Sequence, residues 1–223
     1  MKLDDAKDRI PSRLYNTLLP EIDEFRPAQE KAIGNGLLER KNLLVCTPTA
    51  SGKTLIAELA MVKGILEEKG KAIYIVPSKA LAGEKFNDFK KRYKFLNVAM
   101  SIGDLDSADP FLESYDIIVC TAEKLDSLIR HHAPWLSKVG TIVVDEVHLM
   151  NDSGRGPTLE VIMTMLMQML ADVQIVALSA TIGNPKELAE WLQANLIEDD
   201  WRPVKLEKGI MFENKIEFEE ENK

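Results

Sequence analysis

A loop of eight residues between an apolar run and a helix-compatible run most constrains what this chain can fold into. The apolar run Leu43–Cys46 leads into the loop, and Leu55–Met61 leads out of it. The first N–H groups of a helix have no partner within the helix, and the positive end of the helix dipole points the same way. A strand, a tight loop and a helix in this order therefore make an anion site. The loop consists of Thr47, Pro48, Thr49, Ala50, Ser51, Gly52, Lys53 and Thr54.

The residue types in the loop indicate that the anion is a nucleoside triphosphate. Gly52 lets the backbone pass close to phosphate oxygens. Lys53 brings a positive charge to the terminal phosphates, and the Thr54 hydroxyl can ligate magnesium. The loop departs from the pattern G-x-x-x-x-G-K-[ST], because Thr47 stands where the first glycine is expected. The alternative is a helix start that binds nothing, and the strand before it and the helix after it count against that alternative.

The rest of the chain alternates between apolar, strand-like runs and helix-like segments. Strands that are apolar throughout and alternate with helices predict an α/β fold of three layers, with a mainly parallel central sheet covered by helices on both faces. The predicted strands are 42–46, 72–76, 98–102, 117–120, 141–144 and 174–178, followed after Pro203 by short strands over 204–206 and 210–218. The predicted helices are 54–68, 79–93, 123–131, 157–171 and 185–194, preceded by a helix that starts at Pro27 and runs on through Leu38.

Polar residues follow the carboxyl ends of five of these strands. They are Thr47–Thr54, Pro77–Lys79, Thr121–Lys124, Asp145–His148 and Ser179–Thr181. Because ligands of parallel sheets bind outside the carboxyl ends of the strands, these segments should meet at one active edge.

Asp145, Glu146 and His148 offer the groups that a magnesium nucleotide needs. Asp145 is suited to hold magnesium through water, and Glu146 is placed to orient and deprotonate an attacking water. His148 is better suited to hydrogen-bond a neighbouring loop than to ligate magnesium. An ordinary helix cap and first turn is the alternative for this segment.

Two further signals are weak when taken alone. The amide of Gln29 offers the donor and acceptor needed to read the edge of adenine, although a solvated helix residue is the more common case. Ser179, Ala180 and Thr181 follow the last strong strand, where two hydroxyls could bond His148 or Glu146 and couple the site to a second surface. An ST-turn before the next helix is the alternative.

The net charge, the cysteine content and the length of the apolar stretches restrict the class of protein. A net charge of −8 and a pI near 5.1 argue against a generally basic nucleic-acid-binding surface and leave room for a local groove. The two cysteines, Cys46 and Cys120, each close an apolar run, which favours buried free thiols in a reducing compartment. No stretch is long and apolar enough to span a bilayer, so we expect a soluble protein of the cytoplasm. Residues 1–12 are polar and expected to be frayed or loosely docked.

These segments, in this order, resemble the motifs of superfamily 2 helicases, and the resemblance covers about residues 10–210. It implies a RecA-like P-loop NTPase domain that binds ATP and magnesium. It also implies that Lys53, Asp145, Glu146 and His148 are catalytic, that Thr54 and Asp145 hold the magnesium, and that the strand ending at Ser179 lies between the strands ending at Cys46 and Val144. The residues that would contact nucleic acid are Pro77, Ser78, Lys79, Gly103, Asp104, Thr121, Glu123 and Lys124. The family usually has Leu in place of Ser78 and often Arg in place of Lys79.

The finer resemblance is to the Ski-like branch, and within it to archaeal Hjm-type DNA repair helicases. It is carried by the loop Thr47–Thr54, by Asp145–Leu149, and by Ala180–Asn184 leading to Trp191 and Arg202. It implies an ATP-driven monomer that moves 3′ to 5′ on single-stranded or forked DNA in repair or replication restart. An RNA helicase of the same branch, a nucleotide-dependent binding module without turnover, and a P-loop kinase are the alternatives.

The same resemblance divides the chain into three parts. Residues 1–24 form an N-terminal segment, and residues 25–209 form the first RecA-like helicase domain. Residues 210–223 are the start of a connection to a second RecA-like domain or a disordered acidic tail. Because that second domain supplies arginine fingers, we expect this chain alone to bind nucleotide and to hydrolyse it slowly.

Overall fold

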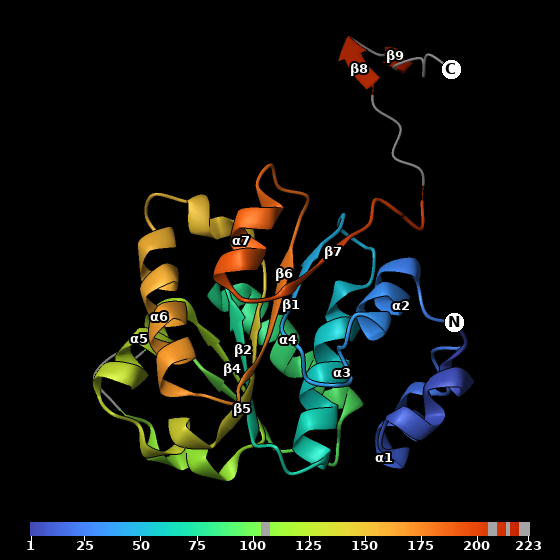
Figure 1. Ribbon diagram of the computed structural model, residues 1–223. Helices are drawn as coiled ribbons and strands as arrows, with labels where there is room; N and C mark the ends of the chain where they lie inside the picture. Colours follow the sequence, from blue (N-terminus) through green and yellow to red (C-terminus); the bar gives the residue numbers. More distant parts are fainter. Residues whose placement is uncertain (104–107, 205–208, 213–214, 219–223) are drawn as a thin grey trace.

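The structure, a computed structural model, describes residues 1–103, 108–204, 209–212 and 215–218. Seven strands form its main sheet: β1 (Leu43–Cys46), β2 (Lys71–Val76), β3 (Val98–Ser101), β4 (Ile117–Thr121), β5 (Val139–Val144), β6 (Gln174–Ser179) and β7 (Asn195–Glu198). The strands pair in parallel, in the order β3-β4-β2-β5-β6-β1-β7 (Figure 1). Every residue of β1, β4, β5 and β6 is buried, as expected for a parallel sheet that is covered on both faces.

Helices cover both faces of the sheet and make three layers, which confirms the predicted fold class. The helices are α1 (Ser12–Leu18), α2 (Pro27–Gly34), α3 (Lys53–Leu66), α4 (Lys79–Arg92), α5 (Ala122–Arg130), α6 (Gly156–Met169) and α7 (Pro185–Trp191). Helices α1 to α4 share one apolar core with Leu43 and Val45, whereas α5 to α7 share the other with Leu44 and Cys46 (Figure 1). Successive residues of β1 thus point to opposite cores. Within the described residues, no helix has the length and apolar character that crossing a membrane requires.

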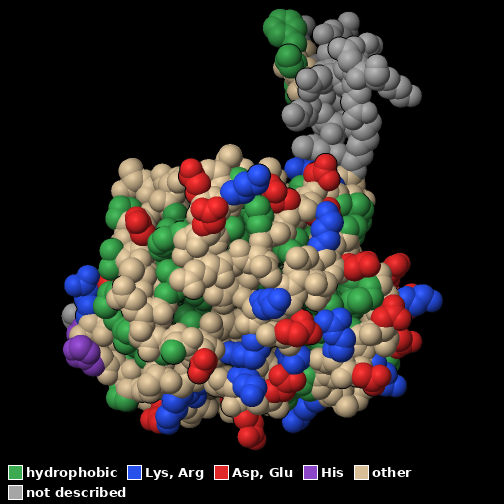
Figure 2. All heavy atoms as spheres, in the orientation of Figure 1, with side chains coloured by type: hydrophobic (Ala, Val, Ile, Leu, Met, Phe, Trp, Pro, Cys, Tyr) green, Lys and Arg blue, Asp and Glu red, His purple; other side chains and the backbone are tan. Residues whose placement is uncertain are grey.

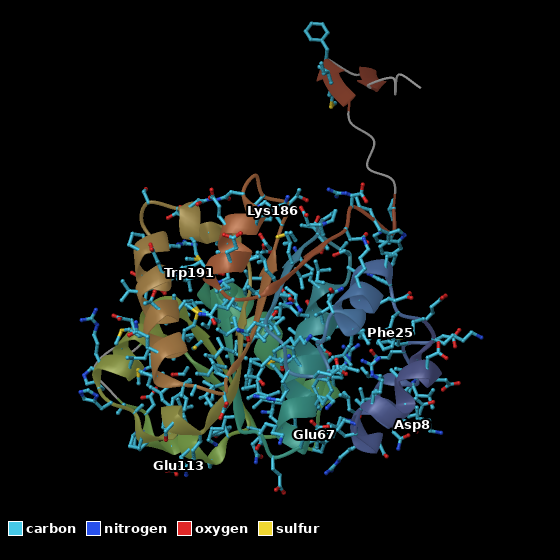
Figure 3. The ribbon with its side chains drawn as sticks, viewed as in Figure 1. Asp8, Phe25, Glu67, Glu113, Lys186 and Trp191 are labelled. Carbon is cyan, nitrogen blue, oxygen red and sulfur yellow. The ribbon has the colours of Figure 1, made fainter. Side chains whose placement is uncertain are left out.

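The strand register brings the carboxyl ends together at one edge. Cys46 of β1 pairs with Ser179 of β6, and Val76 of β2 pairs with Thr121 of β4. As the family resemblance implied, β6 lies between β1 and β5. Figure 3 marks the two ends of the domain, with Lys186 at the start of α7 near the carboxyl edge and Glu67, just after α3, at the opposite end.

The N-terminal segment is docked, so of the two expected states, frayed or loosely docked, the frayed one was wrong. Residues Leu3–Arg9 form a 3₁₀ helix that buries Leu3 and Ala6. Backbone hydrogen bonds run from Leu3 N to Asp23 O at 2.9 Å and from Phe25 N to Met1 O at 2.9 Å. Two apolar side chains among charged neighbours are too few to show periodicity in the sequence, yet both are buried here.

Several element boundaries differ from the predictions. Helix α2 ends at Gly34 instead of continuing through Leu38, although Leu37 and Leu38 are still buried in the turn that follows. Strand β7 was missed, because only Ile197 of its four residues is buried and the segment carries no strong strand pattern. The predicted strand 210–218 is a hairpin of β8 (Gly209–Phe212) and β9 (Lys215–Phe218). The predicted strand 204–206 falls largely outside the described residues.

Candidate nucleotide and nucleic-acid site

The loop after β1 has the backbone conformation of an anion-binding cradle. Ala50 has φ +63° and Gly52 has φ +92°, so the chain twice enters the left-handed region before α3 begins. Alternation of this kind turns backbone N–H groups into one concavity. A φ of +92° favours glycine at position 52, and a Cβ atom there would lie 2.4 Å from Nε2 of Gln29 and displace that amide from the loop.

Thr47 has a clear role in the place where the phosphate-loop pattern has glycine. Its side chain is fully buried, and its Oγ1 shares a hydrogen bond of 2.7 Å with Oγ of Ser51. Its N–H donates to the carbonyl of Ser179 at 3.2 Å. The threonine therefore closes the loop across its base and ties it to the end of β6, so the departure from the pattern does not disrupt the loop.

Lys53 lies inside the site, between the phosphate loop and β6. Its ammonium donates to the carbonyls of Thr47 at 3.1 Å and Ser179 at 2.9 Å. Burial lowers the pKa of Lys53, and the carboxylates of Glu146 and Asp145 oppose that shift. A buried cation held by carbonyl oxygens and facing two carboxylates is a group suited to meet phosphate oxygens.

Gln29 is buried against the phosphate loop, so it is not a solvated helix residue. Its Oε1 accepts from the N–H of Arg26 at 2.9 Å, and its Nε2 donates to the carbonyl of Gly52 at 3.0 Å. The guanidinium of Arg26 donates to the carbonyl of Ala50 at 2.7 Å and lies 5.6 Å from the ring centroid of Trp201. Recognition of adenine by Gln29 stays a prediction. The contact between Gln29 and the phosphate loop was not predicted from the sequence.

Asp145 and Glu146 follow β5 directly and face the loop. The Oδ2 of Asp145 accepts from the hydroxyl of Tyr74 at 2.8 Å, and its Oδ1 accepts from the N–H of Glu146 at 3.1 Å. Glu146 adopts φ +54°, a strained conformation for a residue with a side chain. An ordinary helix cap would not need this conformation, which favours a functional role for the turn.

His148 connects this turn to the segment after β6. Its Nδ1 accepts from the N–H of Ala180 at 3.4 Å and lies 3.3 Å from Oε2 of Glu146. Of the coupling residues, Ser179 is buried and Thr181 is exposed. The bonding of His148 to a neighbouring loop thus agrees with the prediction, but the donor is the backbone N–H of Ala180 and not the expected hydroxyl of Ser179, whose Oγ is buried without a hydrogen-bond partner among the described residues.

Thr54 and Asp145 fit a magnesium nucleotide by their chemistry. Both offer hard oxygen donors, and magnesium is commonly held by one or two protein ligands with phosphates and waters completing its shell. Within the described part of the chain, no group of three or more His, Cys, Asp or Glu residues gathers as a separate metal cage. Lys85 of α4, which the sequence analysis missed, donates to Oγ1 of Thr54 at 3.3 Å.

The loop that starts at Pro77 presents an exposed lysine at the same edge. Ser78 caps α4 by accepting from the N–H of Leu81 at 3.3 Å, and Lys79 is exposed. The carbonyl of Pro77 accepts from the guanidinium of Arg155 at 3.3 Å. Arg155 was also missed, because a single arginine in a loop carries no pattern.

The other predicted nucleic-acid contacts are only partly exposed. Glu123 is exposed, whereas Thr121 is buried and caps α5. The side chain of Lys124 is 2% exposed and its ammonium lies 3.0 Å from Oδ2 of Asp109, so it stabilises the loop from inside. A direct contact of the Lys124 ammonium with nucleic acid does not fit this burial. Gly103 is exposed with φ +98°, and Asp104 lies outside the described residues.

Comparison with protein families decides the class. The model for the family described as "DEAD/DEAH box helicase" matches residues 26–188. The chain belongs to the DEAD/DEAH box helicase family.

Relatives of this DEAD/DEAH box domain are much longer than the chain. The "ATP-dependent DNA helicase Hel308" of Pyrococcus abyssi is 56% identical over 200 residues, which are 89% of this chain and 28% of that protein. The protein of the same description from Pyrococcus horikoshii is 51% identical over 222 residues, 99% of this chain and 30% of its own. The chain therefore spans less than a third of the length of these relatives.

A solved structure shares the fold of the helicase domain. The DUF1998 helicase MrfA bound to DNA has a TM-score of 0.74 and 27% identity, over 86% of this chain and 30% of that one. Its complex with DNA and AMPPNP gives a TM-score of 0.73. These values confirm the RecA-like α/β architecture.

Proposed function

We propose that this domain is the ATP-binding motor domain of an ATP-dependent DNA helicase that moves 3′ to 5′ on DNA. The observation that carries the proposal is the direct contact between the phosphate loop and the end of β6, through Lys53 and the carbonyl of Ser179 at 2.9 Å. His148 then joins the segment after β6 to Glu146. The likeness to proteins described as ATP-dependent DNA helicases favours DNA as the nucleic acid. A role in DNA repair or replication restart is part of the same proposal.

Each residue of the nucleotide site has a role in this proposal. Lys53 and the N–H groups of the loop bind the phosphates, and Gln29 holds the loop and reads adenine. Thr54 and Asp145 would hold magnesium, which neutralises phosphate charge when bound. Glu146 orients the attacking water and takes its proton. Through His148, a change in the position of this carboxylate would be transmitted to Ala180 and Thr181.

Nucleic acid would bind along the loops at the same edge, on the side of β2 and β4. A hollow there is lined by Pro77, Glu123, Asp145, Glu146 and Arg155, so the nucleic-acid loops and the nucleotide carboxylates border one space. On the face shown in Figure 2, Lys and Arg side chains stand among Asp and Glu side chains rather than in one basic patch. With a net charge of −8, binding must be local and carried by a few cations.

Replacing Lys79 with Ala should weaken DNA binding about equally for all sequences. A phosphate contact carries no sequence information, and losing one should reduce the slope of log affinity against log salt by about 1. Fluorescence anisotropy with a labelled oligonucleotide over a salt series measures both effects. Lys41→Ala is the control, because this exposed lysine lies at the opposite, amino edge of the sheet. An unchanged affinity and slope in Lys79→Ala would show that the loop has been misread.

The full-length protein that carries this domain should unwind DNA in preference to RNA. Matched DNA and RNA duplexes, each with a 3′ or a 5′ single-stranded tail, separate the alternatives in one assay. We expect ATP-dependent opening of the 3′-tailed DNA duplex and of a fork. Opening of the RNA duplex alone would favour the RNA helicase, and tight nucleotide-dependent binding without opening would favour a binding module.

The proposal extends to the organisation of the whole protein. A second RecA-like domain would close the nucleotide cleft, and residues 210–223 would begin the connection to it. We propose a monomer acting on single-stranded or forked DNA, because the two RecA-like domains of one protein would together form a complete nucleotide site.

A further inference from the structure

We propose that Tyr74 is a positioning residue that sets the orientation of the Asp145 carboxylate for magnesium nucleotide. The inference rests on the proposed function, because it assigns a supporting group to the same site. Neither the motif pattern nor the family resemblance singled out Tyr74, which reads in the sequence as one more core residue of an apolar strand.

The hydrogen bonds of Asp145 carry the argument. The hydroxyl of Tyr74 donates to Oδ2 at 2.8 Å, and the N–H of Glu146 donates to Oδ1 at 3.1 Å. Each oxygen thus has one fixed donor, which restricts rotation of the carboxylate and leaves further lone pairs for a ligand. Groups that orient a metal-binding carboxylate in this way tune its affinity without touching the metal.

The position of Tyr74 is itself fixed on both sides. Tyr74 is fully buried in β2 and pairs in register with Val143 of β5, two residues before Asp145. Its ring meets that of Phe89 edge-on, with centroids 5.1 Å apart and an interplanar angle of 67°. The packed ring therefore places the hydroxyl at one point relative to the carboxylate.

The hydroxyl of Tyr74 has one hydrogen, and it donates that hydrogen to the Asp145 carboxylate. A buried hydroxyl costs free energy unless it is hydrogen-bonded, and phenylalanine would fill the same space without that cost. The hydrogen bond to Asp145 therefore explains why tyrosine, and not phenylalanine, occupies this position.

The test compares nucleotide affinity with and without magnesium in residues 1–223. A fluorescent ATP analogue is titrated into Tyr74→Phe in excess magnesium and again in EDTA. We expect the gain in affinity that magnesium provides to fall by about ten-fold, as for other outer-shell groups, with affinity in EDTA unchanged. In Tyr74→Phe combined with Asp145→Asn, we expect no further loss beyond that of Asp145→Asn alone.

Tyr93→Phe is the matched control. Tyr93 is also fully buried, and its hydroxyl also donates to a carboxylate, that of Glu58, which lies outside the assigned site. We expect this variant to melt at a lower temperature and to keep the full magnesium gain. A general loss of packing would instead reduce the gain in both tyrosine variants, and that result would overturn the inference.

Three outcomes separate this inference from the proposed function. The positioning role is overturned if magnesium raises the nucleotide affinity of folded Tyr74→Phe as much as that of the wild type. It is also overturned if the variant loses as much nucleotide affinity in EDTA as in magnesium. If Tyr74→Phe does not fold, Phe89→Leu replaces it, since a loosened ring should reduce the gain at least about two-fold and an unchanged gain contradicts the role. Equal binding by the wild-type chain and Lys53→Ala would instead overturn the proposed function.

Discussion

Residues 1–223, tested by themselves, are expected to bind ATP and to hydrolyse it about three to five orders of magnitude more slowly than a chain that adds the second RecA-like domain. The expected rate follows from the charges around the transferred phosphoryl group. An arginine supplied by a second domain stabilises the charge of the transition state in related phosphoryl transfers. Two arginines near this edge, Arg26 and Arg155, are instead hydrogen-bonded to the carbonyls of Ala50 and Pro77.

Phosphate release under single-turnover conditions, with and without single-stranded DNA, measures this difference. Binding of a fluorescent ATP analogue to the same preparation is the control, because it shows that slow hydrolysis does not come from a damaged phosphate loop. Rapid, DNA-stimulated turnover by residues 1–223 would contradict the prediction and show that the chain completes the site by itself.

Glu146→Gln in the full-length protein should reduce ATP turnover by about two to four orders of magnitude, the usual contribution of a general base. The amide keeps the shape of the side chain but cannot take a proton from water. Nucleotide affinity should stay close to that of the wild type, because Lys53 and the loop N–H groups make the phosphate contacts. The measurement is ATP hydrolysis in saturating DNA, together with nucleotide binding.

Glu160→Gln provides the matched control for this substitution. Glu160 is an exposed glutamate of α6, and no role in the site is assigned to it. The same chemical change there should leave turnover unchanged. If ATP hydrolysis survives in Glu146→Gln, the assigned base is wrong and the binding module without turnover becomes the better interpretation.

The sheet and its active edge were predictable because their signals are local. Strands such as Leu43–Cys46 and Ile117–Cys120 are buried on both faces, so all their residues are apolar or small and the strands can be recognised from residue type alone. The phosphate loop could be placed for a similar reason, since a strand, a glycine and a lysine follow one another. Because the carboxyl ends of parallel strands meet at one edge, the topology alone predicted that Asp145 and Ser179 lie near the loop.

Contacts between distant segments could not be predicted in the same way. The hydroxyl of Tyr74 distinguishes it from other core residues only once Asp145 is known to lie beside it. Lys85 resembles any charged residue of a surface helix until α4 is packed against α3. Lys124 shows the opposite case, in which a lysine expected at the surface is buried in an ion pair with Asp109.

The docked N-terminal segment has a practical consequence for anyone who produces this domain. The backbone bond between Phe25 and Met1 fixes the chain just before Arg26 and Gln29, and those two side chains hold the phosphate loop. The amino group of Met1 itself pairs with Glu30 at 2.7 Å. An affinity tag fused to the first residue would remove that charge next to α2, the helix that carries Gln29, whereas a tag at the other terminus would leave this contact intact.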